Sequence, residues 1–307
     1  MSFQRVAIIG LGLLGGSIGL AIRQYLPGVA TSGYDRDPET RRRAATRGLA
    51  DRIGESSADA VRDCDLVIFC VPPGAMREAA REVASALPAG ALVSDVGSCK
   101  QSIAAALAEA LPSHAIIPAH PVAGTENSGP DAGFAELFQN RWCIVTPPDD
   151  ANPHQLTKLV QFWEALGANV EVMEAGHHDL VLAVTSHLPH LIAYTIVGTA
   201  SDLEDVTQSE VIKYSAGGFR DFTRIAASDP TMWRDVFIAN KDAVLEMLQR
   251  FTEDLTALQR AIRTGDGQML FDQFSRTRAI RRSIIAEGQD DARPDFGRSD
   301  HGNGANP

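Results

Sequence analysis

Cysteine is scarce in this chain, and its cysteines do not form a motif. The 307 residues include four cysteines, Cys64, Cys70, Cys99 and Cys143, with no Cys-x-x-Cys pair and no metal-ligand spacing among them. This pattern argues against a disulfide framework and against a cysteine-based metal site. It is typical of free thiols in a reducing cytosol, and we expect no bound metal.

Positive charge is also in short supply. The chain has 28 lysines and arginines against 39 aspartates and glutamates, which gives a formal net charge of -11. A surface of this kind repels phosphate, so neither nucleic acid nor an anionic membrane is an expected partner. A small anionic substrate remains compatible, because a few well-placed cations outweigh a distant negative background in a partly desolvated site.

Signal sequences and long uninterrupted apolar runs are not found. The N-terminus passes directly into a strand-like run at Arg5, without the pattern of a signal peptide. The most apolar stretch, around Leu180 to Ala200, is broken by two histidines, a serine and a proline between residues 186 and 190. We interpret it as a buried helix and not as a membrane span, and we expect a cytoplasmic protein.

The first half of the chain alternates short apolar runs with helical segments. Runs with strand character lie at residues 5–10, 65–71, 91–95, 115–118 and 142–146. Asp37 and Pro38 have the residue types of a helix N-cap and a first helical position. Strands that are apolar throughout are typical of a parallel sheet covered on both faces, so residues 1–172 are predicted to form a doubly wound, Rossmann-type α/β domain.

The second half is predicted to be all-helical. Between Trp233 and Arg263, apolar residues recur at seven-, four- and three-residue steps, which predicts one long helix with a single apolar stripe. Such a stripe must pack on something, so we expect a helical dimerisation domain over residues 173–287 and a homodimer. Residues 288–307 are poor in apolar side chains and are predicted to be a disordered tail.

A glycine-rich loop follows the first predicted strand. Gly10, Gly12 and Gly15 fit the pattern Gly-x-Gly-x-x-Gly, and Asp35 ends the next strand. Gly10 would allow the tight turn, Gly12 the approach of a pyrophosphate, and Gly15 close packing of helix and strand. A carboxylate at Asp35 would accept hydrogen bonds from ribose hydroxyls and repel a 2′-phosphate.

NAD is therefore the expected cofactor. Arg36 leaves NADP possible, because an arginine beside the acidic position can also neutralise a 2′-phosphate. The expected cofactor-binding residues share the glycine loop or the two neighbouring strand ends: Gly10, Leu11, Gly12, Leu13, Leu14, Gly15, Asp35, Arg36, Val71 and Pro72.

Two further strand ends carry polar side chains, at the edge where open α/β sheets bind their ligands. Ser98 follows the strand that ends at Asp95, and it could donate to a ligand or cap the next helix. His120 opens a His-Pro-Val-Ala-Gly-Thr loop. With an ordinary pKa of about 6.5, it is neutral near pH 7 and could take a proton from a substrate hydroxyl.

Two segments of the helical half are also unusual. His187 and His190 lie three residues apart in an apolar helix, so they share a face. They could contact a substrate or form a buried structural pair, and the lack of neighbouring ligands argues against zinc. Arg224 could bind a substrate carboxylate, or it could pair internally with Asp221 or Asp179.

Together these segments resemble the prephenate/arogenate dehydrogenase family. The resemblance rests on four stretches in the family's order and covers about residues 5 to 285: Asp95-Val-Gly-Ser, His120-Pro-Val-Ala-Gly-Thr-Glu, Ser186-His-Leu-Pro-His, and Asp221-Phe-Thr-Arg-Ile-Ala-x-Ser-Asp-Pro-x-x-Trp233. It implies NAD-dependent oxidative decarboxylation of prephenate or arogenate in tyrosine biosynthesis, with inhibition by tyrosine plausible.

The resemblance also implies residue roles. His120 would accept the proton of the ring hydroxyl, and Ser98 would position that hydroxyl and orient His120. Arg224 would bind the ring carboxylate. The other implied positions are Gly124, Thr125 and His187 in the substrate pocket, His178 and Asp179 as a gating pair at its entrance, and Trp233 reaching the partner's site.

Other enzymes and a regulator remain as alternatives. A β-hydroxyacid dehydrogenase or an imine reductase shares the two-domain plan, but the former usually needs a lysine where this helix offers His187. A regulator that binds NAD without catalysis would have no use for His120, His187 and Arg224.

Overall fold

The computed structural model describes residues 3–125, 127–202 and 217–286. The chain forms two compact units, Met1–Leu245 and Glu246–Pro307. The predicted tail, residues 288–307, lies outside the described residues. The domain boundary predicted after residue 172 falls inside the first unit and stays a prediction.

The centre of the first unit is a parallel sheet with the strand order β3-β2-β1-β4-β5-β6. Its strands are β1 (Arg5–Ile9), β2 (Ala30–Tyr34), β3 (Arg52–Ile53), β4 (Leu66–Phe69), β5 (Leu92–Asp95) and β6 (Ala115–Ile116). The order reverses between β1 and β4, which leaves a crevice at their carboxyl ends. The predicted doubly wound α/β fold is confirmed.

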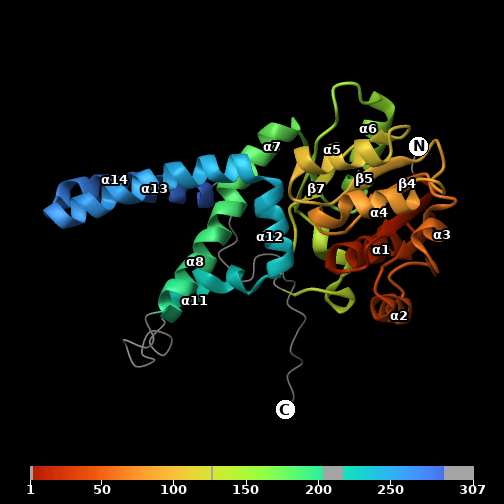
Figure 1. The fold of residues 1–307 in the computed structure, drawn as a ribbon, viewed down its shortest axis with the longest axis horizontal. Coiled ribbons are helices and arrows are strands. Elements are labelled where there is room, and N and C mark those ends of the chain that lie inside the picture. Colours follow the sequence, from red (N-terminus) through yellow and green to blue (C-terminus); the bar gives the residue numbers. More distant parts are fainter. Residues whose placement is uncertain (1–2, 126, 203–216, 287–307) are drawn as a thin grey trace, which may run out of the picture. The chain divides into compact units, whose positions relative to one another are not determined.

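Helices cover both faces of this sheet (Figure 1). They are α1 (Leu13–Tyr25), α2 (Pro38–Arg47), α3 (Ser57–Val61), α4 (Met76–Val83), α5 (Lys100–Ala110) and α6 (Pro153–Ala165). Successive strand residues feed two separate cores: Ile8 and Ile68 belong to one, Ala7 and Val67 to the other. The strands are apolar throughout because neither face meets water. The predicted cap at α2 is confirmed, since the Asp37 carboxylate accepts hydrogen bonds from the first-turn amides.

A second, three-stranded sheet was not predicted. β7 (Ala119–Pro121) pairs antiparallel with β8 (Trp142–Val145), which pairs parallel with β9 (Asn169–Val172). The sequence placed residues 142–146 in the main series of strands, which is wrong. Pro118 has no amide hydrogen to continue pairing with β5, and its carbonyl accepts from Thr146 of the second sheet instead.

Beyond β9, the described residues of the first unit, 173–202 and 217–245, are mainly helical. Its elements are α7 (Ala175–Leu182), a π-helical turn η4 (Ala183–His187), α8 (Leu188–Asp202), α11 (Gly217–Thr223), a 3-10 turn η5 (Arg224–Ala227), α12 (Pro230–Ala239) and the start of α13 (Lys241–Thr264). The π-turn lies just before Pro189, which cannot donate a helical hydrogen bond. Turns of this kind frequently occur at functional sites.

The prediction of a single long helix from Trp233 to Arg263 is wrong, because the helix is interrupted at Asn240. The Asn240 side chain turns inward and donates hydrogen bonds to the Asp179 carbonyl and to the His187 ring, at 2.8 and 3.1 Å. A polar side chain bonded to these partners ends α12 at Ala239. The apolar periodicity continues across Asn240 and conceals this interruption.

The helix predicted to be buried between Leu180 and Ala200 is only partly so. The segment Ala175–Asp202 has the length and hydropathy of a membrane span, and 22% of its most apolar window is buried. One face carries His178, Asp179 and His187 into the interior, while Leu180, Val184 and Ile196 are exposed on the other. Because the other face of this segment packs in the interior, its exposed apolar face indicates a surface for a partner.

The second unit contains the remainder of α13 and α14 (Gly267–Ala286). Gly265, with φ of 72°, provides the left-handed turn between them, and Asp266 accepts the first-turn amide of Met269. Leu255, Ile262 and Phe271 are exposed on this unit. Exposed apolar side chains of this size are typical of an interaction surface.

Candidate functional site

The glycine loop between β1 and α1 has the geometry that its sequence predicts. Gly10 has φ of 99°, and a side chain there would strike the Cys70 carbonyl. A side chain at Gly15 would strike the Gly10 carbonyl, whereas nothing lies within 4 Å of a side chain placed at Gly12. The space beside Gly12 and the uncapped N-terminus of α1 fit a pyrophosphate, whose charge the helix dipole would stabilise.

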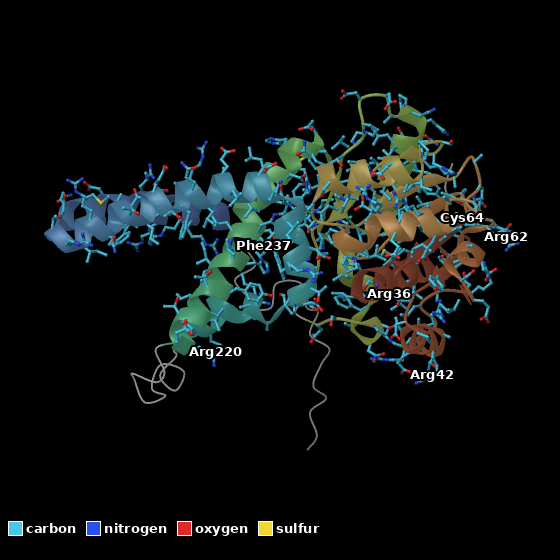
Figure 2. The ribbon with its side chains drawn as sticks, in the orientation of Figure 1. Arg36, Arg42, Arg62, Cys64, Arg220 and Phe237 are labelled. Carbon is cyan, nitrogen blue, oxygen red and sulfur yellow. The ribbon has the colours of Figure 1, made fainter. Side chains whose placement is uncertain are left out.

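Asp35 lies at the other side of this loop. One carboxylate oxygen accepts from the Leu11 amide at 2.9 Å and the other from the Asp37 amide at 3.0 Å. These bonds hold the carboxylate at the end of β2, where an adenosine ribose would lie. Arg36 follows it and is exposed on the surface (Figure 2).

The remaining expected cofactor residues surround the same crevice. Val71 is next to Gly10, since a side chain at Gly10 would lie 3.1 Å from a Val71 methyl group, and Pro72 follows at the surface. Leu13 and Leu14 are half-buried against the core in the first turn of α1. The residues present therefore fit a dinucleotide.

His120 lies on β7 and joins two residues of α7 in a buried relay. Its Nδ1 is 2.8 Å from His178 Nε2, and His178 Nδ1 is 2.9 Å from Asp179 Oδ1. His178 is fully buried, and His120 and Asp179 are exposed by 8% and 2%. The strand after β6 and the first turn of α7 thus bring together residues that lie 58 positions apart.

The proton positions in this relay follow from its last member. The Asp179 carboxylate can only accept, so His178 Nδ1 carries the hydrogen and His178 Nε2 is a bare acceptor. His120 Nδ1 must then donate to it, which leaves His120 Nε2 with a free lone pair. The relay holds His120 in the tautomer of a general base, as the third residue does in nucleophile–base–acid sites.

The charge state of the relay suits this role. Burial lowers the pKa of His120 well below its usual value, and the neighbouring His178, Lys100 and His187 lower it further. Burial also lowers the pKa of His178, although its bond to Asp179 opposes the change. For Asp179, burial acts to raise the pKa, but hydrogen bonds from His178 and from backbone amides lower it overall. Both imidazoles are therefore neutral near pH 7.

Asp179 also caps α5. Its two oxygens accept from the Lys100 and Gln101 amides at 2.7 and 3.0 Å, across 79 and 78 residues of sequence. Both side chains are buried, and the gating role at a pocket entrance predicted for His178 and Asp179 stays a prediction. The alternative cap, Ser98, makes no capping bond, since Cys99 is the N-cap residue of α5 and has no side-chain bond.

His187 and Trp233 form the apolar side of the site. The Asn240 amide donates to His187 Nδ1, so His187 Nε2 carries the hydrogen. His187 Nε2 and Trp233 Nε1 are buried without a hydrogen-bond partner among the described residues. Two buried N–H donors in one cluster suit a ligand with oxygen acceptors, since an unmet donor is costly. Burial lowers the pKa of His187 to about 4, so this donor is uncharged.

His190 does not act together with His187. Its ring stacks on Trp233, with centroids 3.6 Å apart, and its Nδ1 bonds the Ser186 carbonyl at 2.8 Å. Phe237 of α12 packs on the same tryptophan, with ring centroids 5.5 Å apart. Trp233 is 6% exposed in its own chain, and the expectation that it reaches the partner's site stays a prediction.

Ser98 and Arg224 lie near histidines of this cluster, and Gly124 and Thr125 follow His120 in the chain. The Ser98 backbone is near the His187 ring, and Ser98 is half-buried. Arg224 begins η5 and is close enough to His190 to lower its pKa, although burial lowers it more. Gly124 is exposed, and the half-buried Thr125 accepts a hydrogen bond from the Asn127 amide in the loop after His120.

Sequence reasoning missed the parts played by Lys100 and Asn240. Lys100 stood in a recognised segment, next to Ser98, but nothing in the sequence predicts that its side chain is fully buried. Asn240 had a weak signal: it is a poor helix former within an apolar stripe. Among the described residues, no group of three or more histidine, cysteine, aspartate or glutamate side chains is placed to hold a metal.

Two family models match the chain in succession. One, described as prephenate dehydrogenase, nucleotide-binding domain, matches residues 18–172. The other, described as prephenate dehydrogenase, dimerization domain, matches residues 174–276. A cyclohexadienyl dehydrogenase from Zymomonas mobilis is 44% identical over 282 residues, which is 92% of this chain and 96% of the relative.

Solved structures give the same result. Prephenate dehydrogenase from Aquifex aeolicus, in complex with hydroxyphenyl propionate and NAD+, has a TM-score of 0.86 at 33% identity and covers 92% of this chain and 99% of its own. Synechocystis arogenate dehydrogenase has a TM-score of 0.77 at 26% identity, over 92% of this chain and 100% of its own.

Proposed function

This chain belongs to the prephenate dehydrogenase family, and we propose that a single site in it uses both prephenate and arogenate. It is an oxidoreductase that uses NAD, and its reaction is the oxidative decarboxylation of a cyclohexadienyl acid. The family match favours this function over the hydroxyacid dehydrogenase, imine reductase and regulator alternatives. The observation that carries the mechanism is the relay that leaves His120 Nε2 free to accept a proton.

The proposed chemistry needs one proton transfer and correct orientation. Hydride leaves the ring carbon that bears the hydroxyl, and NAD, when bound, supplies the acceptor. His120 Nε2 takes the hydroxyl proton as the ring carbonyl forms. Loss of the ring carboxylate as carbon dioxide then makes the ring aromatic, and His120 returns the proton to the phenolate oxygen. Aromatisation drives the reaction, so the protein mainly orients the reactants.

The remaining roles are proposed from the family resemblance and the neighbouring geometry. Ser98 positions the ring hydroxyl at His120, and His187 donates from Nε2 to the substrate side chain. Trp233 contributes its N–H beside His187. Gly124 and Thr125 close the pocket from the loop after β7.

Replacing Arg224 by alanine is expected to raise the KM for prephenate by about ten- to a hundredfold, with a smaller effect on kcat. An arginine guanidinium makes charge-assisted hydrogen bonds to a carboxylate, and alanine removes the charge and the hydrogen bonds. Steady-state kinetics measure this, with Arg220→Ala as the matched control on the exposed face of α11 (Figure 2). An unchanged KM in Arg224→Ala would show that the arginine is structural.

We propose that Asp35 makes NAD the preferred cofactor. Its carboxylate is held by two backbone amides, so it cannot turn away from a 2′-phosphate without losing both bonds. Arg41, the nearby cation on α2, is committed to the carbonyl oxygens of Asp35 and Arg36. Arg36, which is exposed, then offsets little of the repulsion between the Asp35 carboxylate and a 2′-phosphate.

The proposal is tested by mixing the purified protein with NAD or NADP and with prephenate or arogenate. We expect absorbance of the reduced cofactor to rise with both acids, and the KM for NAD to be lower than that for NADP. Turnover of only one acid would overturn the dual specificity. A lower KM for NADP would show that Asp35 does not select the cofactor.

Three further properties are proposed. The dimerisation-domain match and the exposed apolar face of α7 and α8 support a homodimer, which light scattering would test.

Tyrosine, which shares the phenol of the product, would compete with substrate and raise its KM without changing kcat. Cell fractionation would test the cytoplasmic location, which the free thiols support.

A further inference from the structure

Lys100 is a lysine whose side chain is fully buried. Its Nζ donates to Asp95 Oδ2 at 2.5 Å and to the Ala119 carbonyl at 2.7 Å. Asp95 ends β5 and is also fully buried, and Ala119 begins β7. Lysine is almost never buried in this way unless it is paired, because an ammonium group loses its hydration. The ammonium therefore joins the ends of strands from two different sheets.

The same residue bonds one end of the relay, Asp179, and the residue that precedes the other end, His120. The Lys100 amide donates to Asp179 Oδ1, the oxygen that also bonds His178. The Lys100 ammonium bonds the carbonyl of Ala119, the residue that precedes His120. A change in the position of Lys100 would thus alter the separation between the strand that carries His120 and the helix that carries His178 and Asp179.

Its charge also acts on the relay. Groups that face His120 are His178 on α7, His187 on η4 and Lys100 on α5, and all three disfavour protonation of His120, after burial itself. The Lys100 ammonium itself acts on Asp95, on the His120 and His178 rings, and on the buried thiols of Cys99 and Cys143. Burial raises the pKa of Asp95, and the Lys100 ammonium opposes that rise.

We propose that Lys100 is a positioning residue for the reaction, which fixes the strand segment bearing His120 and keeps that imidazole in its basic, uncharged form. The inference rests on the proposed role of His120 as general base. It differs from a purely structural role, since replacing both members of a buried ion pair by apolar side chains of similar volume is often neutral for stability, whereas removing one member is destabilising. Replacing both would keep the fold and lose the electrostatic effect.

The test uses the full-length protein and three variants: Lys100→Met, Lys100→Arg and, as a matched control, Lys158→Met. Lys158 is a partly buried lysine on α6 that pairs with Asp65 at 3.3 Å. Two quantities are measured: the pH profile of kcat/KM for prephenate, and the titration of the His120 ring by NMR, assigned with His120→Asn. The NMR measurement needs no turnover.

In the wild type, the base must be neutral to act and its folded pKa is lowered, so kcat/KM should stay level through pH 6.5 and fall only below it. In Lys100→Met, removal of a positive charge should raise the His120 pKa by about half a unit or more and move the acid limb to higher pH. We expect kcat to fall more than KM rises. Lys100→Arg, which keeps the charge, should retain the wild-type acid limb, as should Lys158→Met.

A His120 titration in Lys100→Met that matches the wild type would overturn the proposal, as would an equal loss of activity at every pH. If Lys100→Met does not fold, the double variant Asp95→Leu/Lys100→Met removes both buried charges. The pH profile of kcat/KM and the His120 titration are then measured on this variant. A wild type that turns over neither acid would contradict the proposed function, whereas a His120 titration shifted in Lys100→Met would still support the coupling of Lys100 to His120.

Discussion

Replacing His120 by asparagine is expected to lower kcat by about two to four orders of magnitude while NAD binding survives. Asparagine can occupy the space and keep one hydrogen bond to His178, but it has no lone pair basic enough to take a hydroxyl proton. The cofactor crevice lies at the ends of β1 and β4, on strands that do not include His120, so the Kd for NAD should change little.

Single-turnover kinetics and calorimetric titration with NAD measure the two effects separately. His154→Asn provides the matched control, since His154 is an exposed histidine in the first turn of α6. Turnover retained in His120→Asn would remove His120 from the role of base. Loss of NAD binding together with turnover would instead point to a folding defect.

The second large effect is expected for Asp179→Asn, with kcat reduced by about ten- to a thousandfold and substrate KM nearly unchanged. An amide can accept from His178 Nδ1 with its oxygen, so the His120 tautomer can persist. Its nitrogen then faces the Gln101 amide, where two donors meet and one capping bond of α5 is lost. The negative charge that stabilises a protonated His120 through His178 is also lost.

This prediction is checked by steady-state kinetics alongside Asp51→Asn. Asp51 accepts hydrogen bonds from the backbone amide and the hydroxyl of Thr31, at 2.8 and 2.9 Å. Asp51→Asn therefore perturbs comparable hydrogen bonds at a site away from His120. Wild-type kcat in Asp179→Asn would show that the carboxylate serves only as a helix cap. Thermal unfolding of both variants separates the cost to stability from the cost to catalysis.

The parts of the fold that the sequence predicts well are those set by local chemistry. The β-branched run before Gly10 is covered on both faces, and its composition shows this without any knowledge of its neighbours. Asp37 starts α2 because its carboxylate accepts hydrogen bonds from first-turn amides, and the fixed backbone angle of Pro38 suits the first helical position. The glycine loop is predictable for the same reason, since backbone conformation and close approach are demands on single positions.

The parts that sequence reasoning missed depend on contacts between distant segments. Asp179 caps α5 from 79 residues away, and the gating role inferred from the resemblance gave no sign of this. The same holds for the interruption at Asn240, whose side chain bonds His187 and Asp179 and not its own helix. Periodicity reports which residues face a core, but not where a polar side chain interrupts the helix.

The central claim is that each hydride loss at the site of His120 is followed by loss of carbon dioxide from the same substrate molecule. The most direct measurement is the amount of reduced cofactor and of carbon dioxide released in one reaction with prephenate and NAD. We predict equal amounts of the two, with an aromatic product. Reduced cofactor formed without carbon dioxide would contradict the account, because it would mean oxidation of an alcohol without aromatisation of the ring.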